Sequence, residues 1–146
     1  MKDTFRIISL LFLVTLIVVN CGRTSPPPKE DFAPPTIIFT SPDNQSLDNS
    51  ITTAITIEFN ESMDPASVTS ETISVRDMMT GALVEIDIAC AGAEVVLTAL
   101  SPFQKFTVYA VHVTTGVRDI AGNAMLNAMT FTFKTGSQGD STSPDV

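Results

Sequence analysis

The sequence predicts an all-β protein whose folded part is a seven-stranded antiparallel β-sandwich. Between residues 35 and 136, apolar residues recur at every second position in short runs, and turn-forming residues separate these runs. This alternation is typical of strands that bury one face. No window of the chain has sustained helical periodicity.

Each predicted strand hides its apolar face and leaves Thr or charged residues on the other face. In "ITTAITIEFN", for example, Ile55, Ile57 and Phe59 alternate with Thr56 and Glu58. The seven predicted strands are residues 36–42, 51–60, 71–77, 82–89, 93–100, 106–115 and 128–135.

Three local features refine this prediction. Asp64 followed by Pro65 predicts a single helical turn within residues 63–70, with Asp capping the turn and Pro at its first position. Tyr109 stands near the start of the sixth strand, where sandwiches often have a Tyr whose hydroxyl bonds to nearby backbone. His112 has the opposite parity to Tyr109 on that strand, so we expect it to point outward.

The N-terminus has the pattern of an export signal. Lys2 and Arg6 precede an apolar run over residues 7–19, which is too short to span a bilayer comfortably because a spanning helix needs roughly 20 residues. The run ends in "VVNC" and then "GRTSPPP", a pattern that resembles the bacterial lipoprotein signal. That resemblance implies cleavage before Cys21 and attachment of lipid to Cys21. An uncleaved N-terminal anchor is the alternative.

These features divide the chain into four parts: a signal peptide (1–20), a Pro-rich tether (21–34), the sandwich (35–136) and a polar, disordered tail (137–146). Several prolines rule out a helix or sheet ladder in the tether and favour an extended spacer. If Cys21 carries lipid, Cys90 has no partner in the chain, and we interpret it as a small, partly buried residue near a strand end. A disulfide between the two cysteines and a reactive Cys90 thiol are the alternatives.

The charge balance argues against nucleic acid. The formal net charge is −8, and removal of residues 1–20 makes it about −9 because that segment carries two basic residues and one acidic residue. Binding of phosphates needs clustered basic side chains, but the remaining six are scattered. The same charge argues against adsorption of the folded part to anionic lipid. The six are Arg23, Lys29, Arg76, Lys105, Arg118 and Lys134.

Three stretches of the predicted sandwich carry recognisable motifs. Residues 34–68 contain the Pro-rich entry, "SP" and "FNESMD"; residues 109–125 contain "VRDIAGN"; residues 131–135 read "FTFKT". Together these motifs resemble the bacterial Ig-like domain of surface-layer proteins. The resemblance implies an Ig-like sandwich and a modular, structural or adhesive role outside the cell. Members of that family are not themselves enzymes.

Candidate chemistry is sparse. Asp119 and Asn123 offer too few oxygens for calcium, so we interpret "DIAGN" as a tight turn with Asp119 capping the backbone. Glu61 and Asp64 could act as an acid–base pair only if they shared a buried cleft. His112 has no second ligand at metal spacing. We therefore predict no catalytic, metal or cofactor site and no enzymatic activity.

Two functions follow from these features. The first is a lipid-anchored, exported structural module or spacer at the cell envelope, held at the outer membrane or cell surface through Cys21. The second is an adhesin or assembly module that binds a protein or glycan through loops or an edge strand. Phe103 is the loop aromatic that we expect to be exposed.

Overall fold

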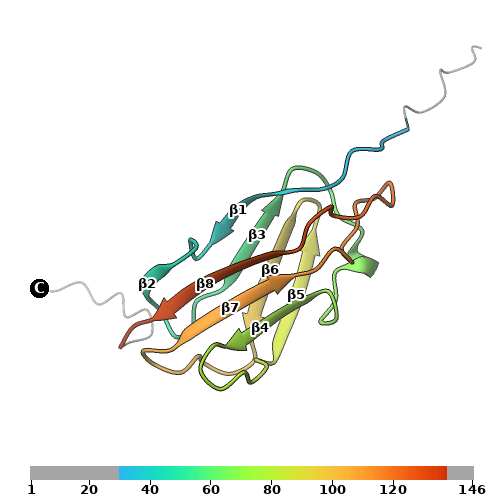
Figure 1. Ribbon diagram of the computed structural model, residues 1–146. Helices are drawn as coiled ribbons and strands as arrows, with labels where there is room; N and C mark the ends of the chain where they lie inside the picture. Colours follow the sequence, from blue (N-terminus) through green and yellow to red (C-terminus); the bar gives the residue numbers. More distant parts are fainter. Residues whose placement is uncertain (1–29, 138–146) are drawn as a thin grey trace, which may run out of the picture.

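The computed structural model describes residues 30–137 (Figure 1), which form a β-sandwich with one short 3₁₀ helix. Cys21, the predicted signal peptide, most of the tether and most of the tail lie outside the described residues. The elements are β1 (Ile37–Ser41), β2 (Ser46–Asn49), β3 (Ile55–Phe59), η1 (Pro65–Ser67), β4 (Ile73–Asp77), β5 (Ile86–Ala91), β6 (Glu94–Ala99), β7 (Val108–Val113) and β8 (Met129–Thr135).

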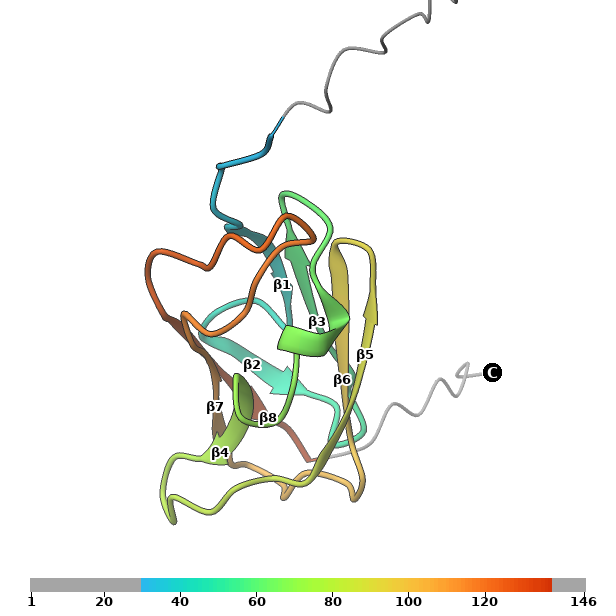
Figure 2. The ribbon, with the colours of Figure 1, turned by 90° about the vertical axis from the view of Figure 1, so that its right-hand side faces the viewer.

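The strands form two four-stranded sheets, with the orders β1-β3-β6-β5 and β2-β8-β7-β4. Figure 2 shows the two sheets packed face to face, with β3, β5 and β6 on one side and β4, β7 and β8 on the other. Every paired strand is antiparallel to its neighbour except β2, which runs parallel to β8. The all-β sandwich predicted from apolar alternation is therefore confirmed.

The predicted strand number was one too low, because β2 has no alternating pattern. Its sequence is "SLDN", and Asp48 has a positive φ of 57°. The chain leaves the first sheet after Ser41 and joins the second sheet through Gln45, whose N–H donates to the carbonyl of Thr132 at 2.6 Å. The first predicted strand thus continues into a second, short strand on the opposite sheet.

The predicted strand over residues 82–89 is divided in the same way. Leu83 bridges to Arg76, and the N–H of Val84 donates to the carbonyl of Val75 at 2.9 Å, so this part lies along β4. The chain then crosses to the other sheet and begins β5 at Ile86. Alternation alone cannot show this crossing, because the apolar face points into the same core on both sides of it.

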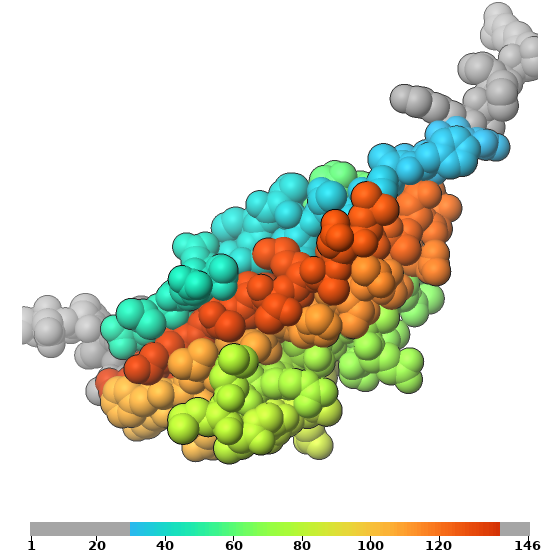
Figure 3. Space-filling view, viewed as in Figure 1, coloured from blue at the N-terminus to red at the C-terminus, as the bar shows by residue number. Residues whose placement is uncertain are grey.

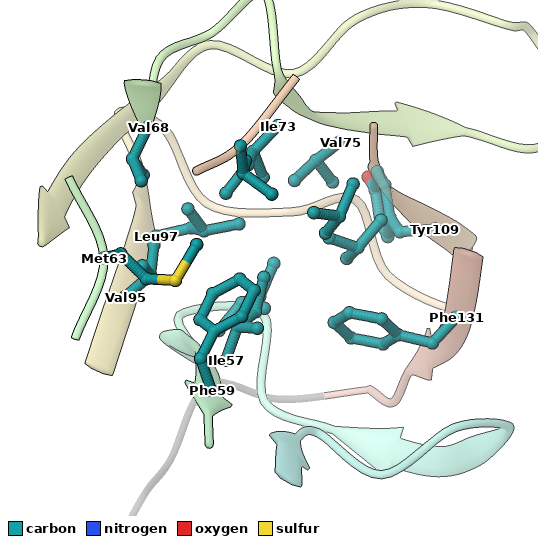
Figure 4. Close-up of a cluster of buried hydrophobic side chains, with 14 of the residues drawn as sticks. Ile57, Phe59, Met63, Val68, Ile73, Val75, Val95, Leu97, Tyr109 and Phe131 are labelled. Atoms are coloured by element: carbon teal, nitrogen blue, oxygen red, sulfur yellow. The ribbon is translucent and has the colours of Figure 1, made fainter. Parts of the chain in front are cut away.

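The core lies between the sheets (Figure 4), where inward side chains from both sheets meet. The alternating residues of β3, β4, β7 and β8 supply most of it, as their sequences predict. The largest fully buried side chains are Phe59, Phe131, Phe133, Ile55, Ile57, Met63, Ile73, Leu97, Val75, Val95, Val111 and Val113.

Phe103 belongs to this core, so its predicted exposure was wrong. Its side chain is 4% exposed. Its ring centroid lies 4.6 Å from that of Tyr109 and 5.4 Å from that of Phe133. The predicted bond of the Tyr109 hydroxyl is confirmed: it accepts from the N–H of Gln104 at 2.8 Å. The loop before β7 folds back onto Tyr109 and carries Phe103 inward with it.

Candidate functional site

The chain enters and leaves the sandwich at opposite ends (Figure 1), as the space-filling view also shows (Figure 3). At the entry end, the N–H of Thr36 donates to Oδ1 of Asn60 at 2.6 Å. At the exit, the N–H of Gly136 donates to the carbonyl of Asn49 at 2.9 Å. The two ends of the described chain, at residues 30 and 137, therefore lie at opposite ends of the sandwich.

We call the loops around Asn60–Asp64 and Arg118–Asn123, with residues 31–36, the entry end. Its centre is Asp119, whose side chain is 1% exposed. The Asp119 carboxylate accepts from the backbone N–H and from the side-chain amide of Asn123, both at 2.8 Å. Asn123 also donates to the carbonyl of Asp31 at 3.1 Å, which joins the loop to the entering chain.

These contacts confirm the tight turn predicted at "DIAGN". The N–H of Gly122 donates to the carbonyl of Asp119 at 3.1 Å, and Gly122 has a φ of +93°, a conformation that glycine adopts without strain. Asp119 satisfies the loop backbone as an Asx cap does. Among residues 30–137, no three His, Cys, Asp or Glu side chains are grouped so that they could hold a metal ion.

The entry end shifts two carboxyl pKa values in opposite directions. Burial alone would raise the pKa of Asp119, but its hydrogen bonds from Asn123 and from the backbone of Ala121 and Gly122 outweigh burial and lower that pKa. The pKa of Glu61 is raised by partial burial first, and then by the nearby charges of Asp119 and Asp31. Asp119 is thus held ionised, and Glu61 is the easier of the two to protonate.

Asp64 caps the 3₁₀ helix, as predicted. Its Oδ1 accepts from the N–H of Ala66 at 3.0 Å, with Pro65 at the first helical position. The hydroxyl of Ser67 donates to the Asp64 carbonyl at 2.8 Å and accepts from the N–H of Arg118 at 2.9 Å. The carboxylate of Asp64 therefore has a structural role, and these bonds join the two loops of the entry end.

His112 and Cys90 occupy the surroundings that the sequence predicts. His112 is exposed on the outer face of β7, with Nδ1 2.8 Å from the hydroxyl of Thr130. Cys90 is half-buried near the end of β5. Its thiol pKa is raised by burial first and then by the charge of Asp64. Because a thiol reacts as its thiolate, these surroundings make Cys90 less reactive than an exposed cysteine.

The side of the sandwich formed by β4 and β5 is hollowed, and we call it the open side. The hollow has a volume of about 490 Å³. Leu83 and Leu100 on its rim are 60% and 64% exposed. The lining residues are Ser70, Ile73, Ser74, Leu83, Val84, Glu85, Ile86 and Leu100. Glu61, Asp64 and His112 are not among them, so this hollow does not unite the candidate acid–base residues.

The exposed apolar residues of the open side were missed in the sequence, although strand parity could have identified them. Leu83 has the same parity as the outward-facing Glu85 and Asp87, and Leu100 has the same parity as Thr98. The pattern also missed Ile38 and Phe39 of β1, which are 60% and 49% exposed.

The strand order defines the class of protein. It is that of an immunoglobulin-type sandwich, with strands A, B, E and D in one sheet and C, F and G in the other, and with the first strand divided between the sheets as β1 and β2. Residues 31–135 match the family model of the bacterial Ig-like domain. The chain belongs to this family.

Solved structures share the fold at low sequence identity. The N-terminal part of the bacterial S-layer protein SbsC aligns with a TM-score of 0.55 and 16% identity, over 71% of this chain and 24% of that one. CopC from Methylosinus trichosporium OB3b aligns with a TM-score of 0.54 and 19% identity, over 70% of this chain and 93% of that one. The L,D-transpeptidase LdtMt1 in complex with imipenem aligns with a TM-score of 0.52 and 14% identity, over 71% and 41%.

The chain thus spans about a quarter of the S-layer protein fragment that it resembles. No curated protein sequence matches it. Within residues 30–137, no helix has the length and apolar character needed to cross a membrane.

Proposed function

We propose that this protein is an exported, lipid-tethered structural module that acts as a spacer at the bacterial cell envelope, on the outer membrane or cell surface. The observation that carries this proposal is the separation of the two ends of the sandwich. In the sequence, Cys21 and the Pro-rich tether come before the entry end. Lipid on Cys21 would hold that end near a membrane, and the rest of the domain would project away from it.

The tether suits this arrangement. Residues 21–34 contain several prolines and would extend at ~3.1 Å per residue, which is a reach of roughly 40 Å. Each buried methylene of an acyl chain adds ~0.8 kcal/mol to membrane affinity, so two or more chains on Cys21 would anchor the protein firmly. The folded part carries a net negative charge, so an anionic membrane surface would repel it.

The polar groups of the sandwich support a structural role rather than catalysis. Asp119 and Asp64 hold loops, and the Tyr109 hydroxyl holds the loop before β7. Family membership and the likeness to an S-layer protein agree with a structural unit outside the cell. The likeness to a transpeptidase concerns the fold, since the identity is 14%. We therefore propose that the protein is not an enzyme.

A binding role is the second candidate, and the open side favours it. Its hollow is lined mostly by apolar residues and lies between two sheet edges. Exposed apolar surface on a soluble domain often marks a contact site for another molecule. In this case the module would act as an adhesin or assembly unit that holds a protein or glycan. A screen of the protein against matrix proteins and glycans tests this role, and no binding would count against adhesion.

Detergent phase partition tests the tether. The full chain is expressed in a bacterium as wild type, Cys21→Ser and Cys90→Ser, and each is partitioned between water and detergent. We expect wild type and Cys90→Ser to enter the detergent phase after removal of the leader, and Cys21→Ser to retain its leader. Identical processing and partition of all three chains would contradict the lipid tether.

A further inference from the structure

The two sheets have four edge strands, namely β1 and β5 in one sheet and β2 and β4 in the other. An edge strand presents backbone N–H and C=O groups that can pair with a strand of another molecule. Folded proteins commonly prevent this pairing by shortening, bending or covering the edge. Three of the four edges in this sandwich carry such a feature.

The pairing of β1 with β3 contains a register shift, which bends the edge. The strand β2 has four residues and an irregular register with β8. The edge of β4 is covered by the chain that follows it. There the N–H of Asp77 donates to the carbonyl of Ala82 at 3.0 Å, and the N–H of Val84 donates to that of Val75 at 2.9 Å.

The strand β5 has none of these features. It pairs with β6 in an unbroken register over six residues, and it contains no Pro, Gly or Lys. Within residues 30–137, the backbone of Ile86–Ala91 makes no hydrogen bond apart from its ladder with β6. Figure 2 shows β5 at the rim of the sandwich with no strand beyond it.

The side chains of β5 are also compatible with a neighbouring strand. Asp87, Ala89 and Ala91 are exposed on the outer face, and Ile86, Ile88 and Cys90 are half-buried toward the core. An added strand would shield the exposed flanks of the half-buried residues. The strand has a single charged residue, so few charges would oppose pairing.

We propose that β5 pairs antiparallel with β5 of a second copy of this chain, about a two-fold axis at Ala89. This pairing would join two four-stranded sheets into one continuous sheet. A two-fold contact uses the same surface on both copies and closes on itself, so it produces a dimer rather than a fibre. The proposal does not depend on the lipid tether.

The charge of Asp87 selects this register. Side chains that pair across antiparallel strands lie on the same face, so Asp87 must face Asp87, Ala89 or Ala91 of the other copy. Pairing with Asp87 itself places like charges directly opposite. Pairing with Ala89 leaves the two aspartates diagonal, about 7–8 Å apart. Pairing with Ala91 places Ala89 on the axis and separates the aspartates by roughly 14 Å, four residues along the strand.

Cysteine crosslinking in the full chain tests this dimer. Ala89→Cys is introduced into a chain that carries Cys90→Ser, and intact bacteria that express it are treated with a thiol oxidant. A residue on the two-fold axis lies opposite its own copy, at a separation that a disulfide can bridge. We expect a disulfide-linked dimer on a non-reducing gel. The matched control is Thr98→Cys, which is exposed on the adjacent strand β6 but away from the edge.

The register is tested by co-expression of Asp87→Cys and Ala91→Cys chains. We expect the two variants to crosslink with each other, and we expect the Ala91→Cys chain, which keeps Asp87, not to crosslink with itself. All three positions on β5 are exposed on the outer face, so the substitutions leave the core intact. If Ala89→Cys forms no more dimer than Thr98→Cys, the proposal is wrong. Crosslinking of Ala89→Cys with Phe39→Cys on β1 would instead show a head-to-tail contact and would also overturn it.

Discussion

The entry end and the open side of the sandwich differ in the surroundings of their side chains: hydrogen bonds at the entry end, and solvent exposure at the open side. At the entry end, the Asp119 carboxylate accepts from Asn123 within one loop, and Asn123 donates to the entering chain at Asp31. The Ser67 hydroxyl accepts from Arg118 and joins that loop to the other. At the open side, Leu83 and Leu100 lie exposed around a hollow. The loops of the entry end are therefore fixed by hydrogen bonds, whereas the open side exposes apolar side chains to solvent.

This difference gives each region a distinct role in the proposed function. A module held through its N-terminal side needs a well-ordered entry end, because any force on the tether acts there first. An open side with an uncovered edge strand is where such a module would contact another molecule. Substitutions in the two regions should therefore have different consequences for stability.

Asp119→Ala should have the largest effect. It removes a buried carboxylate that accepts from the backbone N–H and the side-chain amide of half-buried Asn123, so the free energy of unfolding should fall by about 3 kcal/mol. Leu100→Ala on the open side is the control, and it should change this free energy by less than ~1 kcal/mol because Leu100 is mostly exposed. Urea unfolding followed by circular dichroism measures both. Equal losses would contradict the difference between the two regions.

Tyr109→Phe should have an intermediate effect. The substitution keeps the ring against Phe103 and Phe133 but removes the acceptor for the N–H of Gln104. We expect a loss of about 1 kcal/mol, which is typical of one hydrogen bond in a partly buried site. The same unfolding measurement checks it, and a loss as large as that of Asp119→Ala would mean that the loop depends on this bond more than the contacts suggest.

The contributions of Asp119 and Glu61 to the free energy of unfolding should change with pH in opposite directions. The lowered pKa of Asp119 stabilises the fold above its ordinary value of 3.8, and this contribution is lost as the pH falls through the still lower folded value. The raised pKa of Glu61 favours the fold below 4.5, and this contribution is lost as the pH rises through the folded value.

We therefore expect the loss caused by Asp119→Ala to shrink in acid. Glu61→Gln should stabilise the protein slightly at neutral pH and have no effect in acid. Unfolding curves recorded across this pH range measure both trends. A Glu61→Gln variant that is less stable at neutral pH would reverse the assigned direction.

The sequence predicts the sandwich well where side chains alternate between core and solvent. In β3 and β8, Ile57 and Phe131 lie in the core as the two-residue period requires. The tight turn at Asp119 and the cap at Asp64 were also predictable, because their chemistry is local to a few residues. These features depend on residues that are close together in the sequence, so they can be predicted from a single sequence.

The features that the sequence did not predict depend on contacts between distant segments. The strand β2 forms because the chain meets β8, and nothing in "SLDN" indicates that pairing. Phe103 is buried because its loop folds back onto Tyr109. The residues of β5 do not show which strands lie beside it. Its free edge can therefore be recognised only when the order of the strands in the sheet is known.

The intact mass of the mature N-terminal peptide tests the central claim most directly. The chain is purified from the membrane fraction of an expressing bacterium, and its N-terminal fragment is analysed by mass spectrometry. The lipid-tethered module predicts a fragment that begins at Cys21 and carries the added mass of a diacylglyceryl group. A fragment that begins at Met1 with an unmodified Cys21 would show that residues 7–19 remain as an uncleaved anchor, and it would contradict the lipid tether.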